Sequence, residues 1–347
     1  MAPNVRKINL ALQGGGAHGA FTWGVLDRLL EDETVEIAGI SGTSAGALNG
    51  AALKAGLLSG GRAAARENLD WLWGEVMDIA DLRFPRWMMG PLAFPEGLAR
   101  AWAEMAVSPA VDAFTRAFSP YDWPFASDNP LRPIADRFHY HRVCADEGPA
   151  FFVAATNVRT GKIRVFSGAE ISTDVLLASA CLPTIFRAVE LRDPVTGKRE
   201  AYWDGGYTGN PALFPLYAPD LPNDIVIVNI NPLVRDALPR RASEIQNRIN
   251  EISFNSSLLR ELRAINFVKE LIADGSLTDR RMKDVHVHMI ADDDLMNSLD
   301  ETTKMLALPG LMAELRDAGR RAAGKFLTRD GDKLGVAASV DLERLFN

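Results

Sequence analysis

The chain has 347 residues, of which 47% are hydrophobic and 24% are charged, and its formal net charge at pH 7 is −7. This composition is ordinary for a globular protein, and the chain is long enough to bury a substantial core. The negative charge argues against generic nucleic-acid binding and gives no reason to expect strong attraction to anionic lipid.

Cysteine usage and the N-terminal segment both indicate a cytoplasmic protein. Cys144 and Cys181 are the two cysteines, and this number argues against a disulfide framework. Residues Met1–Lys7 lead directly into an apolar run, without the longer apolar core and cleavage site of a signal peptide. The uncharged stretch Ile37–Leu53 contains four glycines and several polar residues, so it is a poor membrane span. We expect contact with membranes to be peripheral at most.

Strands and helices alternate in the first sixty residues. Ile8–Leu12 is predicted to be a buried strand, and apolar residues spaced by three or four positions predict a helix over Phe21–Leu30. A second strand over Val35–Ser41 and a second helix over Ala45–Leu58 follow. This order indicates a parallel sheet covered by helices.

Residues 60–118 are rich in helix-forming sequence and are interpreted as a helical cap inserted into the sheet-forming core. Five of the seven tryptophans lie between Trp71 and Trp123, and Phe84–Phe94 is unusually apolar for a segment broken by proline and glycine. Tryptophan suits the boundary between water and lipid, so a lid or an interface-seeking loop is one interpretation. Packing of the cap onto the core is preferred, because clustered aromatic residues usually belong to a core.

The rest of the chain continues with strands and helices. A hairpin is predicted across Asn157–Gly161, and a short helix over Thr173–Cys181 is stopped by Pro183. Further strands are predicted at Val189–Arg192, Glu200–Trp203, Asp224–Ile230 and Val285–Ile290, and further helices at residues 245–272, 308–327 and 338–347. The absence of internal repeats and long linkers favours one continuous domain over residues 1–347.

The segment Gly42-Thr43-Ser44-Ala45-Gly46 joins the second predicted strand to the second helix. A G-x-S-x-G pattern in this context is typical of a nucleophile elbow, a tight turn that exposes its serine at the end of the strand. Gly42 and Gly46 leave room for the turn because neither has a Cβ atom. Ser44 is therefore the candidate nucleophile, close to helix N–H groups that favour negative charge.

The glycine-rich segment Gly14-Gly15-Gly16-Ala17-His18-Gly19 follows the first strand and fits the G-x-G-x-x-G pattern of a dinucleotide site. Such a site needs an acidic residue near the end of the second strand, but Glu36 lies at its start. The alternative is an anion-binding nest of backbone N–H groups at a helix N-terminus. Beside Ser44, Gly14, Gly15 and Gly16 would form an oxyanion hole worth roughly 3–4 kcal/mol per donor.

A serine nucleophile needs a proton acceptor within hydrogen-bond reach. Histidine is the usual one, and the chain has five: His18, His139, His141, His286 and His288. His286 and His288 alternate with valines, which also fits the polar side of an edge strand. His139 and His141 flank a tyrosine with no elbow nearby, and a lone histidine more often has a structural role.

Asp204 is the preferred proton acceptor. It follows a predicted strand, and Gly205-Gly206 would allow the backbone to turn so that the carboxylate projects. A carboxylate with an ordinary pKa of about 3.9 is a weak base. Burial beside Tyr202 and Trp203 would raise that pKa and make Asp204 adequate for the role.

In this order, the glycine loop, the serine elbow and Asp204-Gly205-Gly206 resemble the patatin-like phospholipase family over about residues 7–215. The resemblance implies a three-layer α/β/α fold with a central, mostly parallel sheet. It also implies a Ser–Asp dyad in which Ser44 attacks the ester carbonyl and Asp204 takes the proton. Family activity is the hydrolysis of fatty-acyl esters of phospholipids and neutral lipids, of phospholipase A or lysophospholipase type. No metal or other cofactor is implied.

The chain departs from the family pattern at two positions of the glycine loop. Gln13 stands where many relatives have an acidic residue, and His18 stands where they have arginine or lysine. A neutral His18 would support an anionic head group more weakly. The segment Asn210-Pro211-Ala212 resembles the Asn-Pro segment that fixes the loop after the dyad aspartate, whereas the C-terminal extension at about 240–347 lies outside the shared core.

Three other interpretations remain open from the residues alone. One is a hydrolase of short-chain or storage polyesters such as polyhydroxyalkanoate, and another is a non-catalytic protein that binds lipid or granule surfaces. The third is a nucleotide-binding protein.

Asp292-Asp293-Asp294 is interpreted as a solvated loop, since no other ligands stand at a spacing that would complete a metal site. Arg316, Arg320 and Arg321 are interpreted as the solvated face of a helix.

Overall fold

The computed structural model describes residues 5–83, 119–122, 129–277, 282–299, 301–305 and 307–346. In these ranges, eight strands form one sheet in the order β5-β6-β3-β2-β1-β7-β8, and β4 pairs with β3. The strands are β1 (Arg6–Leu12), β2 (Val35–Thr43), β3 (Ala150–Asn157), β4 (Ile163–Ser167), β5 (Val189–Arg192), β6 (Arg199–Asp204), β7 (Asp224–Val228) and β8 (His286–Ile290). Strands β3, β2, β1, β7 and β8 run parallel, whereas β4, β5 and β6 pair in antiparallel fashion.

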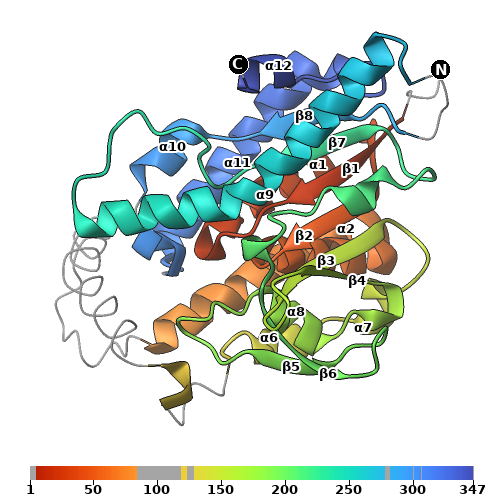
Figure 1. The fold of residues 1–347 in the computed structure, drawn as a ribbon. Coiled ribbons are helices and arrows are strands. Elements are labelled where there is room, and N and C mark those ends of the chain that lie inside the picture. Colours follow the sequence, from red (N-terminus) through yellow and green to blue (C-terminus); the bar gives the residue numbers. More distant parts are fainter. Residues whose placement is uncertain are drawn as a thin grey trace.

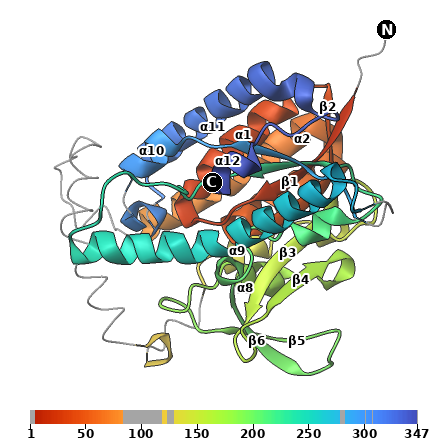
Figure 2. The same ribbon diagram turned by 45° about the horizontal axis from the view of Figure 1, so that its top comes forward.

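Helices cover both faces of this sheet, so the predicted three-layer α/β/α fold is confirmed (Figures 1 and 2). One face packs against α1 (Gly19–Leu30), α2 (Ala45–Arg83) and α11 (Pro309–Asp330). The other face packs against α9 (Ala242–Ala273) and α12 (Leu342–Phe346). The shorter helices are α6 (Arg132–Ala135), α7 (Tyr140–Val143), α8 (Thr173–Ser179) and α10 (Asp293–Ser298).

Strand β1 shows why the sheet has two cores. Successive side chains of a strand point to opposite faces. Leu10 and Leu12 therefore join the core under α1, α2 and α11, whereas Ala11 joins Leu258 and Leu262 of α9 in the other. A strand covered on both faces has no solvated side. The sequences of the central strands are therefore nearly continuous apolar runs.

Helices α1 and α11 cross at a point where two glycines bring the backbones together. A Cβ atom on Gly319 would overlap the carbonyl oxygen of Phe21, and one on Gly24 would overlap the carbonyl oxygen of Arg316. Near this crossing, the guanidinium of Arg320 pairs with Asp27 of α1. The prediction of a solvated arginine face is therefore wrong for Arg316 and Arg320, both half-buried against α1, and fits only Arg321.

The predicted helix at 45–58 extends much further, because α2 continues to Arg83 across a break at Gly60 and Gly61. Gly61 has a φ of 71°, a conformation that favours glycine. Beyond the break, Trp73 stacks on Trp23 with ring centroids 6.4 Å apart. For the described part of the cap, the core-packing interpretation is confirmed. The apolar stretch Phe84–Phe94 lies outside the described residues.

The C-terminal part of the chain differs from two details of the sequence interpretation. His288 lies on edge strand β8 as predicted, but its ring is fully buried, 2.9 Å from Asp224 Oδ1 and 3.1 Å from Ser339 Oγ. The predicted loop at Asp292–Asp294 is wrong for Asp293 and Asp294, which form the first turn of α10. Asp292 caps this helix, because its side chain accepts the Leu295 N–H. Within the described ranges, no cluster of His, Cys, Asp and Glu could hold a metal ion. Nor does any described helix have the length and apolar character of a membrane span.

The glycine crossing predicts opposite effects of two substitutions in α11. Gly319→Ala should destabilise the protein by about 1–3 kcal/mol, because the new methyl group must push α1 away. Gly324→Ala should be neutral or stabilise by up to about 1 kcal/mol, because its Cβ would meet no atom closer than 4.0 Å. Urea unfolding of both variants measures the difference, and equal effects would contradict a tight crossing at Gly319.

Candidate active site

Pairing along one edge of β3 brings the elbow and the Asp204 loop together. Strand β2 occupies this edge up to Thr43, which lies opposite Ala154. The antiparallel strand β6 then takes over, and Asp204 lies opposite the next residue, Ala155. Because β4 occupies the other edge of β3 over these positions, β2 and β6 meet end to end. Ser44, one residue beyond Thr43, therefore lies beside Asp204.

Ser44 has the strained backbone expected of a nucleophile elbow. Its φ is 54°, and it is the one non-glycine with positive φ in the described part of the chain. The Ser44 N–H donates to Ser179 Oγ at 2.9 Å, and that hydroxyl donates to the Ala154 carbonyl at 2.7 Å. Ser179 thus fastens the turn to β3 and helps to offset the strain. The sequence offers no signal that would have identified Ser179.

The glycines around Ser44 lie where a side chain would not fit. A Cβ atom on Gly46 would overlap the Leu12 carbonyl oxygen, and one on Gly42 would lie 2.6 Å from the Gly46 carbonyl oxygen. A Cβ atom on Gly14 would lie 2.7 Å from Cβ of Ser44. The glycine loop is therefore in direct contact with the serine, as the oxyanion-hole hypothesis requires.

The Asp204 carboxyl group is buried, and the Ser44 side chain lies beside it. Its Oδ1 accepts the Gly206 N–H at 2.7 Å. Burial raises the pKa of Asp204 to about 7, although this hydrogen bond and the nearby Ser44 hydroxyl lower it in part. Phe254 of α9 covers the turn, since a Cβ atom on Gly206 would overlap its ring. Gly205 is equally restricted, because a Cβ there would overlap the Ala154 carbonyl oxygen.

Cys181 lies close to this carboxyl group but is held as a neutral thiol. Its backbone carbonyl accepts the Asp204 N–H at 2.8 Å, and its thiol points to the Arg187 carbonyl at 3.1 Å. Burial, together with the nearby Asp204 carboxylate, raises the pKa of Cys181 to about 12. A thiol with this pKa is a poor nucleophile at neutral pH, so Ser44 has no chemical competitor in Cys181.

The three amides of the predicted oxyanion hole are not equivalent. The Gly14 N–H donates to Asn210 Oδ1 at 2.6 Å, and the Gly14 carbonyl accepts from Asn231 Nδ2 at 2.9 Å. In the described ranges, the N–H groups of Gly15 and Gly16 have no acceptor. Gly14 is thus anchored by side chains, whereas Gly15 and Gly16 keep donors available for a developing negative charge.

Gln13 explains one departure from the family pattern. Its fully buried Oε1 accepts the N–H groups of Ile230 and Asn231 at 2.8 and 3.0 Å. Its Nε2 donates to the Asn210 carbonyl at 3.2 Å and to Asn255 Oδ1 at 3.3 Å. A carboxylate could not donate these last two bonds. The amide therefore connects the glycine loop to the loop after β6, to the segment after β7 and to helix α9.

The His18 side chain contacts the C-terminal part of the chain. The side chain is buried, and its Nε2 lies 2.7 Å from Thr303 Oγ1. It therefore points into the contact between the glycine loop and the C-terminal part of the chain. The titratable group beside the Ser44 side chain is Asp204, not this histidine.

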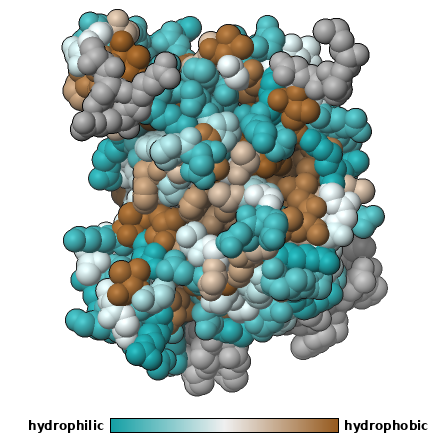
Figure 3. Space-filling model, turned by 90° about the vertical axis from the view of Figure 1, so that its right-hand side faces the viewer, coloured by the Kyte–Doolittle hydropathy of each residue, from teal (hydrophilic) through white to brown (hydrophobic). Residues whose placement is uncertain are grey.

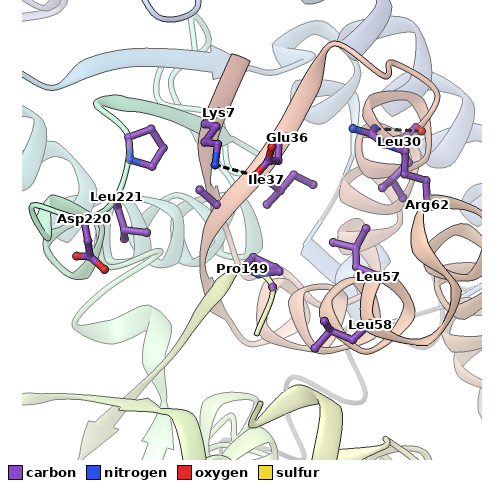
Figure 4. A pocket seen from close by; sticks show the side chains of 13 residues that line it. Lys7, Leu30, Glu36, Ile37, Leu57, Leu58, Arg62, Pro149, Asp220 and Leu221 are labelled. Carbon is purple, nitrogen blue, oxygen red and sulfur yellow. Dashed lines mark hydrogen bonds and ion pairs between the residues drawn. The ribbon is translucent and has the colours of Figure 1, made fainter. Parts of the chain in front are cut away.

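A hollow of about 690 Å³ lies at the amino ends of β1, β2 and β3, away from Ser44. Its lining includes Ile37, Leu57 and Leu221, and apolar surface gathers in the middle of that face of the molecule (Figure 3). Figure 4 shows Lys7 and Glu36 paired at its rim, with 3.1 Å between Nζ and Oε1. Since the elbow follows the carboxyl end of β2, this hollow is not the entrance to the candidate site.

Comparisons with known proteins agree with the motif pattern. A family model described as patatin-like phospholipase matches residues 10–217. Among solved structures, VipD from Legionella pneumophila has a TM-score of 0.42 and 14% identity, covering 94% of this chain and 67% of that chain. A chain of the ExoU–SpcU complex from the type III secretion system of Pseudomonas aeruginosa has a TM-score of 0.36 and 15% identity, covering 94% of this chain and 52% of its own. This chain therefore spans about half the length of that one. A search among curated proteins found no match.

The raised pKa of Asp204 predicts that this carboxyl group destabilises the protein at alkaline pH. Between its unfolded value of about 3.9 and its folded value of about 7, the folded chain holds a proton that the unfolded chain has lost. Stability should therefore fall as the pH rises through this window. Asp204→Asn should remove the effect while keeping an acceptor for the Gly206 N–H. The variant should melt at a higher temperature than the wild type at pH 8, with little difference at pH 4.

Thermal unfolding of both proteins from pH 4 to pH 9 measures this difference. A gap between the two melting temperatures that does not vary with pH would show that the Asp204 pKa is not raised.

Proposed function

This chain belongs to the patatin-like phospholipase family, and we propose that it hydrolyses fatty-acyl esters of lipids through a Ser44–Asp204 dyad and an acyl-enzyme intermediate. Family membership supports lipid acyl hydrolysis in general terms. The finer assignment, a phospholipase A or lysophospholipase type of ester hydrolase, is part of the proposal. The observation that carries it is the position of the strained Ser44 beside a buried carboxyl group whose pKa is raised to about 7.

The first half of the reaction forms the acyl-enzyme. As Ser44 Oγ attacks the ester carbonyl, its proton passes to the Asp204 carboxylate, which lies within hydrogen-bond reach. The carbonyl oxygen becomes an oxyanion, and the N–H groups of Gly15 and Gly16 stabilise it. When the tetrahedral intermediate collapses, Asp204 returns the proton to the leaving alkoxide, and the acyl group stays on Ser44.

The second half repeats these steps with water. Asp204 accepts a proton from the water as it attacks the acyl carbonyl, and Gly15 and Gly16 again stabilise the oxyanion. Collapse releases the fatty acid and returns the proton to Ser44 Oγ. A base with a pKa of about 7 suits both directions of transfer, because it is largely ionised just above neutral pH and still a competent acid once protonated.

Removal of the serine hydroxyl tests the nucleophile. Ser44→Ala should lower kcat for ester hydrolysis roughly 10⁴-fold or more, because no other group can form the acyl-enzyme. Labelling by a fluorophosphonate should disappear as well. The matched control is Ser59→Ala, in which an exposed hydroxyl in the helix that follows Ser44 is removed and activity should persist. Undiminished turnover in Ser44→Ala would refute the dyad.

A substrate panel run on these proteins separates the remaining interpretations. Long-chain phospholipid and neutral-lipid esters should be cleaved faster than short-chain or polyhydroxyalkanoate esters. The opposite order would favour a polyester hydrolase. Absence of covalent labelling in the wild type would favour a non-catalytic lipid-binding protein.

The pH dependence of turnover tests the base. Because Asp204 must be ionised to accept a proton, kcat/KM should rise with pH and level off above an apparent pKa of about 7. A rate profile from pH 4 to pH 9 on a soluble ester measures this value. A rise of kcat/KM centred near pH 4 would mean that the proton acceptor is a carboxylate with an ordinary pKa.

A further inference from the structure

Large apolar side chains are exposed along one short stretch of the chain, before and within the first half of α9. They are Val234, Leu238, Ile245, Ile249 and Ile252, with exposed fractions from 43% to 82%. Single exposed apolar residues are common on protein surfaces. A group of five within nineteen consecutive residues is not scattered in this way, and such clusters mark interaction sites.

Three of these residues form a stripe on α9. Ile245, Ile249 and Ile252 are spaced by four and three positions, so they share one face of the helix. The face packed on the sheet is different, because it carries the buried residues Asn255 and Leu258. Isoleucine is only a moderate helix former, so helix propensity does not account for three of them on a solvated face.

The stripe lies on the side of the molecule that carries the candidate catalytic residues. Phe254, two positions after Ile252, packs against Tyr207 with ring centroids 5.1 Å apart, just beyond Asp204. From there, the first half of α9 projects beyond the sheet, on the side opposite the N-terminus (Figure 1). Since β1 runs away from the N-terminus, this is the side of the carboxyl ends of the parallel strands, where Ser44 lies.

Charges at the start of α9 differ in sign from the chain as a whole. Arg240 and Arg241 are exposed there, whereas the protein carries a net charge of −7. Glu244 neutralises part of this charge, because its Oε1 lies 3.8 Å from Arg241 Nε. Its carboxylate also accepts the backbone N–H groups of both arginines at 2.9 and 3.1 Å. Arginine side chains beside an apolar stripe can extend to the head-group level of a lipid layer.

We propose that the first half of α9 is the surface by which this protein binds a lipid–water interface. Ile245, Ile249 and Ile252 insert among the acyl chains, and Arg240 and Arg241 lie at the level of the head groups. This inference rests on the proposed function, because it places the aggregated substrate against the edge of the sheet that carries Ser44. Burial of apolar surface drives the binding, and anionic lipid adds a smaller contribution.

The experiment compares two double variants that add equal negative charge. Ile249→Asp/Ile252→Asp changes the stripe, and Val195→Asp/Val336→Asp changes two exposed valines outside the stretch 234–252. Each protein is sedimented with vesicles of phosphatidylcholine and phosphatidylglycerol. Its hydrolysis of a vesicle-embedded ester and of a monomeric soluble ester is then measured. Thermal unfolding confirms that both variants are folded.

The affinity of the stripe variant for vesicles should fall by a factor of roughly ten or more, because two apolar insertions are lost. It should lose a similar factor in rate on vesicles and none on the monomeric ester, whereas the control variant should match the wild type throughout. Unchanged vesicle binding by the stripe variant would overturn the inference. The inference would also be overturned if the wild type is a dimer and the same change converts it to a monomer, because the stripe would then bind a second copy of the chain.

Failure of the proposed function gives a distinct pattern. If the wild type hydrolyses neither ester yet still binds vesicles through the stripe, the surface inference stands and the catalytic proposal falls. Vesicle binding by Ser44→Ala at the wild-type level supports the inference in the same way, since binding is then independent of turnover.

Discussion

The candidate site depends on the sharing of one edge of β3 by two strands that arrive from opposite directions. Thr43 ends β2 opposite Ala154, and Asp204 ends β6 opposite Ala155. A shift of one residue in either register would reverse which side of the sheet the following side chain faces. The proximity of Ser44 and Asp204, 160 positions apart in the chain, is therefore a consequence of sheet pairing rather than of any local motif.

This arrangement places two unfavourable features next to each other and surrounds them with hydrogen bonds. The positive φ of Ser44 and the burial of Asp204 each oppose folding. Ser179 holds the strained backbone of Ser44 by a hydrogen bond. The buried amide of Gln13 connects the glycine loop, the segment after Asp204 and α9. This network holds the strained residues in place. The surrounding hydrogen bonds therefore offset the unfavourable free energy of the preorganised site.

Residues 240–347 complete this core. Helix α11 packs on α1 through the Gly319 crossing, and α9 supplies Phe254 over the Asp204 turn and Asn255 to the Gln13 network. Lys304 Nζ donates to Asn231 Oδ1 at 3.0 Å, which links the same part of the chain to the residues that anchor Gly14. The segment outside the shared family motifs thus stabilises the glycine loop as well as the fold.

The sequence by itself determined the order of the strands and of the longer helices, the elbow, the glycine loop and the choice of Asp204, because each depends on residues close together in the chain. Apolar periodicity and glycine spacing carry that local information. Only the tertiary structure decided that Ser179 holds the elbow, that Gly14 is anchored by Asn210, and that Arg320 and His288 are structural. These contacts join residues from 64 to 293 positions apart, and no pattern within one segment specifies which distant partner a polar side chain will meet. The burial that raises the pKa of Asp204 is likewise a property of the assembled layers.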